Sequence, residues 1–89
     1  MSLLSLQITY RNGEPFAAYI YLPRPPGTKV ARTEQVHSEL VVDYAADGAA
    51  LGIEIVSPGA VSIAEINAAF DELGLHRPDP QELAPLKAA

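Results

Sequence analysis

The chain has 89 residues, of which 48% are hydrophobic and 19% are charged. This length supports a single folded domain, and the composition is that of a globular chain rather than a disordered one. Six Lys and Arg residues against eleven Asp and Glu residues give a formal net charge of -5. Nucleic-acid binding by this chain alone is therefore disfavoured, because phosphate backbones are bound by concentrated cations. The absence of cysteine excludes disulfides and thiolate chemistry.

The start of the sequence, MSLLSLQITY, has no basic flank and too short an apolar run for a signal peptide. No stretch of the sequence reaches the length of a membrane span. We therefore expect a soluble, cytoplasmic protein that does not bind membranes.

The first two predicted elements are strands over residues 4–10 and 17–22, because apolar side chains alternate with polar ones in the first and the second is rich in β-forming residues. Asn12 and Gly13 between them are a strong turn signal, since both tolerate positive φ. Pro15 cannot donate a hydrogen bond to a sheet, so we expect the loop of this hairpin to be longer than two residues.

The segment PRPPGT at residues 23–28 interrupts the strand pattern. Its Pro-x-x-P spacing matches ligands of aromatic grooves, but a stiff connection between strands is the simpler interpretation. Residues 29–36 follow as a more polar strand, which we expect at a sheet edge because charge there discourages unwanted pairing.

Residues 39–45 and 50–56 are predicted to form a hairpin around Asp47 and Gly48. A two-residue turn at Asp47–Gly48 gives this hairpin one apolar face. On that face it pairs Leu40 with Ile55, Val42 with Ile53, Tyr44 with Leu51 and Ala46 with Ala49. On the reverse face it pairs Val41 with Glu54, Asp43 with Gly52 and Ala45 with Ala50. This register explains the position of Glu54 between two isoleucines without any chemical role.

A helix is predicted over residues 63–73, with apolar residues recurring on one face. Ser62 is a suitable N-cap, and Glu65 three residues later completes a capping box. Gly74 marks the C-terminal end, because a helix is often followed by a glycine in the left-handed region.

The predicted fold class is α+β: a small two-layer domain over residues 1–74, with an antiparallel sheet of about five strands and one C-terminal helix on one face. Residues 75–89 are a proline-containing tail in which a short helical turn can form near residues 80–84. Leu83 and Leu86 are candidates to dock from this tail.

The sequence resembles a family of small, mostly bacterial proteins known as domain of unknown function 2283. The resemblance covers about residues 7–57, and its most specific parts are Asp43, Asp47–Gly48 and the Gly-Ile-Glu-Ile strand at residues 52–55. It implies the central strand and hairpin described above. The family has no established activity, so the resemblance implies a fold more than a function.

Three features depart from the pattern of this family. One is that the second Asp of the family's usual start has no counterpart before Ala18 and Tyr19. Arg11 replaces an Asp that usually follows the first Tyr, and Ser57 replaces an Asp that commonly follows the Gly-Ile-Glu-Ile strand. If these acids form a site in relatives, this chain lacks it. Some relatives are encoded beside small toxin-like genes, so the resemblance also implies an antitoxin-like role as one alternative.

Asp43 and Glu54 are the candidate chemical site, because they project from one face of adjacent predicted strands and could share a proton or bind a cation. A solvated sheet face is the simpler interpretation, since the pair has no third acid and no nearby histidine. His37 and His76 come from unrelated loops without the spacing of metal ligands. We therefore expect no metal site, no cofactor and no catalytic residues.

Tyr19 and Tyr21 are two residues apart on one strand and would present an aromatic patch, although the sequence leaves open whether the helix or tail covers them. With Val41 and Val56 they form the candidate interface. The first hypothesis is a non-enzymatic interaction module that forms a homodimer or binds a protein partner, through the sheet face away from the helix or through an edge strand. The alternatives are a small-ligand or cation-binding domain, or a minor enzyme, using Asp43 and Glu54, and an antitoxin-like regulator of a basic partner.

Overall fold

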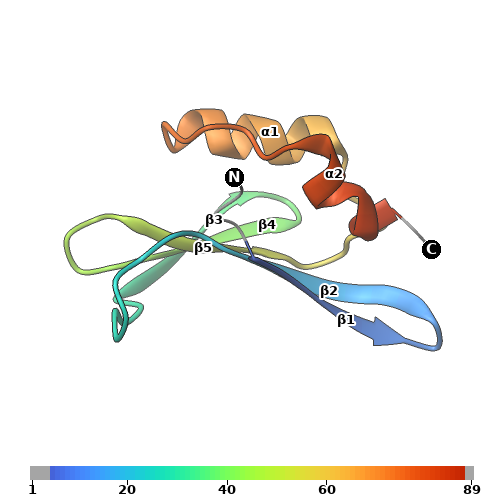
Figure 1. Cartoon of the computed structure of the whole chain (residues 1–89), viewed down its shortest axis with the longest axis horizontal. Coiled ribbons are helices and arrows are strands. Elements are labelled where there is room, and N and C mark those ends of the chain that lie inside the picture. Colours follow the sequence, from blue (N-terminus) through green and yellow to red (C-terminus); the bar gives the residue numbers. More distant parts are fainter. Residues whose placement is uncertain (1–4, 88–89) are drawn as a thin grey trace.

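The computed structural model describes residues 5–87, and within them the chain forms a five-stranded antiparallel sheet and a layer of short helices. The elements are β1 (Ser5–Arg11), β2 (Glu14–Tyr21), β3 (Arg32–His37), β4 (Leu40–Tyr44), β5 (Ala50–Ile55), α1 (Ile63–Glu72), α2 (Pro80–Leu83) and the 3₁₀ helix η1 (Ala84–Lys87). Both α-helices lie over the same face of the sheet (Figure 1). The predicted strand start at residue 4 and the tail end at residues 88–89 lie outside the described residues.

The strand order is β1-β2-β5-β4-β3, with every neighbouring pair antiparallel. The predicted five-stranded antiparallel sheet is thus confirmed, and β3 lies at an edge. The strand itself is shorter at its start than predicted, because regular pairing begins only at Arg32. Ala31 is outside the strand but its N–H still donates to the Tyr44 carbonyl over 2.7 Å.

The first hairpin turns at two residues, so the expectation of a longer loop is wrong. Asn12 and Gly13 have φ values of 54° and 80°, as a type I′ turn requires, and β2 begins directly afterwards at Glu14. Pro15 is accommodated by a β-bulge in which Phe16 is the extra residue. Bulges and unpaired edges are where a strand tolerates proline, and β5 pairs with β2 only further along the chain.

The second hairpin has the predicted register over most of its length. The observed pairs are Leu40 with Ile55, Val41 with Glu54, Val42 with Ile53, and Asp43 with Gly52. Leu40, Val42, Ile53 and Ile55 are fully buried, whereas Glu54 is exposed. Strand alternation therefore sorts this hairpin into an apolar face and a solvent face.

The loop of this hairpin differs from the predicted two-residue turn. Ala45 and Ala49 close a three-residue loop, in which the Gly48 N–H donates to the Ala45 carbonyl over 3.0 Å. Gly48 has a φ of 90°, but Asp47 does not have the positive φ that a type I′ turn needs. A bulge at Leu51 then restores the predicted register, so that Tyr44 pairs with Ala50 and not with Leu51 as predicted.

Helix α1 has the predicted capping box. The Ser62 hydroxyl accepts from the Glu65 N–H over 3.0 Å, and the Glu65 carboxylate accepts from the Ser62 N–H over 3.1 Å. Gly74, with a φ of 71°, follows the C-cap at Leu73. The Leu75 N–H reaches back to the Phe70 carbonyl over 2.9 Å, which satisfies a carbonyl that the helix leaves unpaired.

The helical layer differs from the prediction of a single C-terminal helix. Asp79 caps α2, and Pro80 occupies its first turn, where a missing N–H costs nothing. The side chains of Leu83 and Leu86 are only 2% exposed and join one core with α1 and the sheet. The buried residues of this core are Ala18, Ile20, Leu22, Leu40, Val42, Ile53, Ile55, Val61, Ile66, Ala69, Phe70, Leu83 and Leu86.

Among residues 5–87, none of the helices is long and apolar enough to cross a bilayer.

The burial of Leu83 predicts that α2 contributes directly to stability. Leu83→Ala should lower the free energy of unfolding by about 2–5 kcal/mol, because it removes core contacts and leaves a cavity. The matched control is Leu75→Ala, where the side chain is 37% exposed and the loss should stay below about 1 kcal/mol. Urea denaturation of the two variants measures the difference, and equal losses would show that α2 does not pack on the core.

Candidate functional site

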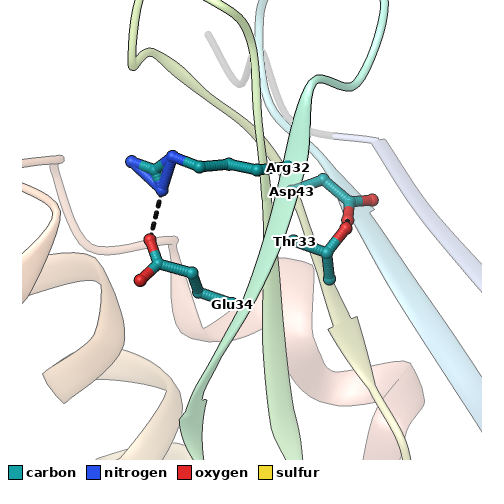
Figure 2. A network of polar contacts seen from close by, with 4 residues as sticks. All are labelled: Arg32, Thr33, Glu34 and Asp43. Atoms are coloured by element: carbon teal, nitrogen blue, oxygen red, sulfur yellow. Dashed lines mark hydrogen bonds and ion pairs between the residues drawn. The ribbon is translucent and has the colours of Figure 1, made fainter.

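The sheet face opposite the helices, called here the open face, carries the candidate residues. Side chains alternate along each strand, so residues next to the buried Ile20 and Val42 point away from the helices. The open face is formed by Gln7 of β1, Tyr19 and Tyr21 of β2, Glu54 of β5, Val41 and Asp43 of β4, and Thr33 and Gln35 of β3. The same alternation is visible on β3, where Thr33 meets Asp43 on one side and Arg32 meets Glu34 on the other (Figure 2).

Asp43 is the centre of the polar contacts on this face. The Tyr19 hydroxyl donates to its Oδ2 over 2.7 Å, and the Thr33 hydroxyl donates to its Oδ1 over 2.7 Å. Tyr19 lies on β2 and Asp43 on β4, with β5 between them. The tyrosine side chain therefore crosses a whole strand, and both carboxylate oxygens of Asp43 are engaged.

Gly52 makes this crossing possible. It pairs with Asp43 on one side and with Tyr21 on the other, so it lies directly beneath the path of the Tyr19 ring. A Cβ atom at this position would overlap with the ring and hydroxyl of Tyr19. Glycine inside a strand often marks such a close approach, and Gly52 is buried because Tyr19 covers it.

Tyr21 extends the contacts towards β1. Its ring centroid lies 4.6 Å from that of Tyr19 at an interplanar angle of 60°, a favourable tilted geometry. Its hydroxyl donates to the Gln7 side-chain oxygen over 2.9 Å. The Arg24 guanidinium lies 5.9 Å from the centroid of the same ring. The two tyrosines are thus an ordered pair held by polar partners at both ends.

Tyr19 is a hydrogen-bond donor rather than a base. Burial, the hydrogen bond to Asp43 and the negative charge of Asp43 raise its pKa well above the ordinary value of about 10. The phenol therefore stays protonated at neutral pH. This state keeps its O–H directed at the carboxylate and leaves the ring neutral.

The structure places both predicted site residues, Asp43 and Glu54, on the open face but gives them different surroundings. Asp43 is partly buried with Tyr19 and Thr33, and Glu54 is exposed. In the described part of the chain no hydrogen bond or ion pair joins the two carboxylates or engages the side chain of Glu54. Across residues 5–87, no three His, Cys, Asp or Glu side chains gather to hold a metal ion.

Glu54 borders a shallow, open depression of about 180 Å³. Its lining is Gln7, Thr9, Ala17, Ala18, Tyr19 and Glu54. Pockets for drug-sized ligands span about 300–1,000 Å³ and enclose most of the ligand. This depression is therefore smaller and more open than a pocket for a drug-sized ligand.

The predicted interface residues Tyr19, Tyr21 and Val41 share the open face, and Val56 follows directly after β5 with 44% of its surface exposed. Thr33, Gln7 and the role of Gly52 were not predicted from the sequence. A glycine inside an apolar strand often marks a close approach by another group, and this was the sequence signal for Gly52. The contacts of Thr33 and Gln7 depend on the directions of side chains from other strands, which the sequence pattern does not give.

Residues 17–57 match the model of a family described as "Protein of unknown function (DUF2283)". The resemblance to domain of unknown function 2283 is confirmed. The DUF2283 match starts within β2 and ends just after β5, so it contains Tyr19, Asp43, Gly52 and Glu54 and leaves out β1 and the helices. No curated protein and no solved structure matches the chain.

Substitution of Gly52 tests the crossing of Tyr19. Gly52→Ala should lower the free energy of unfolding by about 1–3 kcal/mol, because the new methyl group forces the Tyr19 ring away from Asp43. Gly59→Ala is the matched control, because a Cβ there meets no atom within 4 Å and the backbone is not in the left-handed region. Chemical denaturation measures both variants.

A double-variant cycle separates the ring from the backbone. If the Tyr19 ring is the obstacle, Gly52→Ala should cost less in a Tyr19→Ala background than in the wild type. An unchanged cost would contradict the overlap and assign the effect to the strand backbone.

The raised pKa of Tyr19 predicts a loss of stability at alkaline pH. The unfolded chain releases this phenolic proton near pH 10, whereas the folded chain retains it to higher pH. The stabilisation is therefore fully present below about pH 10 and declines as the pH rises towards the folded-state pKa. Tyr19→Phe should lower the free energy of unfolding by about 1 kcal/mol at pH 8 and by less at pH 11.

Urea denaturation at the two pH values measures this difference, with Tyr10→Phe at an exposed position as the control. A stability difference between wild type and Tyr19→Phe that stays constant from pH 8 to pH 11 would rule out the linkage.

Proposed function

We propose that this protein is a small non-enzymatic interaction module that binds a protein partner, or a second copy of itself, through the open face. The helices cover one face of the sheet (Figure 1). The observation that carries this proposal is that an ordered tyrosine pair, Tyr19 and Tyr21, lies on the opposite face. Tyrosine is enriched at protein interfaces, because it offers a large contact area and a hydroxyl with few torsions to fix.

The contacts of Tyr19 support a preorganised interface. Its hydroxyl is held by Asp43 and its ring by Tyr21 and Gly52. A side chain already fixed in the free protein loses little conformational entropy when a partner binds. Val41 and Val56 add apolar surface beside this pair.

A role in small-ligand or cation binding, or in catalysis, by Asp43 and Glu54 is supported less well. Both oxygens of Asp43 already accept hydrogen bonds, so they are less available to a cation or a substrate proton. The depression beside Glu54 is also smaller and more open than an ordinary ligand pocket.

An antitoxin-like regulator is one specific form of the interaction module, in which the partner is a basic protein. The net charge of -5 favours such a partner, because opposite charges accelerate encounter and disfavour partners of the same sign. The proposed role is cytoplasmic, and the cysteine-free composition supports a reducing compartment.

Two lysine substitutions test this interface. Val41→Lys and Val56→Lys each place a long, strongly hydrated cation on or beside the open face. They should weaken self-association, or capture of a partner identified by cross-linking, by about tenfold or more, because the new side chain replaces apolar contact area that the partner must cover. Val30→Lys is the matched control, since Val30 is 48% exposed in a loop outside the sheet. Light scattering over a concentration series measures the oligomer.

A wild-type chain that stays strictly monomeric at high concentration and yields no cross-linked partner would contradict the interaction module. Equal effects of all three lysine variants would show that the open face is not the surface used.

A further inference from the structure

Glu54 is an exposed carboxylate on an otherwise ordered surface. Within residues 5–87 no hydrogen bond or ion pair engages it, whereas Asp43 on the same face has two donors. Glu54 on β5 pairs with Tyr19 on the neighbouring strand β2. The hydroxyl of Tyr19 is held by Asp43 on β4, so the position of its ring is fixed. The open face therefore presents a free negative charge next to a fixed, neutral aromatic ring.

The depression lies at this junction. It is bordered by Glu54, by Tyr19, by the Gln7 side chain and by the small residue Ala17. Along β2, Tyr21 with its bound Arg24 lies on one side of Tyr19, and Ala17 lies on the other. Arg24 thus lies beside Tyr21 and not beside the depression, which borders Tyr19. The depression is therefore accessible to a cation from a partner.

Guanidinium groups contact aromatic rings repeatedly in this chain. Arg11 lies 5.1 Å from the Phe16 ring centroid, Arg24 lies 5.9 Å from that of Tyr21, and Arg32 lies 4.1 Å from that of Tyr44. A cation over an aromatic face is attracted by the ring quadrupole. The Arg32 contact also involves an acid, because the same guanidinium pairs with Glu34.

We propose, resting on the proposed function, that the depression between Tyr19 and Glu54 receives an arginine side chain from a basic protein partner. The guanidinium lies against the Tyr19 ring and pairs with the Glu54 carboxylate, while the Gln7 side chain borders the same space. Arginine fits better than lysine, because its planar group can stack on a ring and pair with a carboxylate at once.

A second copy of this chain is a poorer occupant of the same surface. A second copy presents the same Glu54 and Asp43 carboxylates on its open face, and each chain carries a net charge of -5. Like charges facing each other across an interface are destabilising. The charge balance therefore favours a partner rich in arginine.

The probe is a five-residue peptide, acetyl-Gly-Gly-Arg-Gly-Gly-amide, titrated into the isotope-labelled full chain and followed by backbone amide chemical shifts. The shifts should saturate at millimolar peptide and concentrate on Ala17, Ala18, Tyr19 and Glu54. The matching lysine peptide should bind more weakly, and the neutral citrulline peptide should produce no saturable shift.

Glu54→Gln should weaken the arginine peptide about two- to fivefold, as expected for one exposed ion pair, and Glu54→Lys should abolish the shifts. Glu14→Gln, which removes the same charge from the exposed first residue of β2, is the matched control and should change nothing. Both positions are exposed, so these variants leave the core intact.

Three results would overturn the arginine site: no saturable shifts, shifts spread evenly over the acidic surface, or equal binding by wild type and Glu54→Gln. If any of them occurs while Val41→Lys and Val56→Lys still disrupt association, the interaction module stands and only the arginine site fails. If the wild type neither self-associates nor yields a partner, the interaction module itself fails.

Discussion

The open face of this sheet is organised by one hydrogen bond that crosses a strand. Tyr19 reaches Asp43 over β5 because Gly52 has no side chain in its path. The same bond fixes the ring against which Tyr21 rests and orients the carboxylate that receives Thr33. Hydrogen bonds to a charged acceptor are stronger than neutral ones, so the bonds that Asp43 accepts from Tyr19 and Thr33 stabilise the face more than the neutral bond between Tyr21 and Gln7.

Much of the fold was predictable because local physics determines it. The alternation around Asp47–Gly48 gave the correct pairing of the second hairpin over four residue pairs, and Ser62 with Glu65 located the start of α1. These patterns depend on residues close in sequence. The two loop lengths were less predictable, because Asp-Gly is compatible with both two- and three-residue turns, and Pro15 suggested a constraint that a bulge at Phe16 removes.

The candidate site was only partly predictable for a different reason. The sequence grouped Asp43 with Glu54 because both project from one face of a hairpin. The partners of Asp43 are instead Tyr19 and Thr33, at sequence separations of 24 and 10 residues. Finding them requires the order of the strands and the direction in which a tyrosine leans, and neither follows from periodicity. The depth at which Leu83 docks is likewise a property of the assembled core.

The strand order also divides the sheet into two locally built parts. The pair β1–β2 and the meander β3–β4–β5 each form between chain neighbours, and β2 and β5 are their common border. Joining Tyr21 to Gly52 closes a long stretch of chain, which costs more entropy than either hairpin. Tyr19 bridges this border and continues beyond it to Asp43. We infer that the hydrogen bond from Tyr19 to Asp43 forms only after β2 has paired with β5 in the native register, and that it then stabilises this register against others.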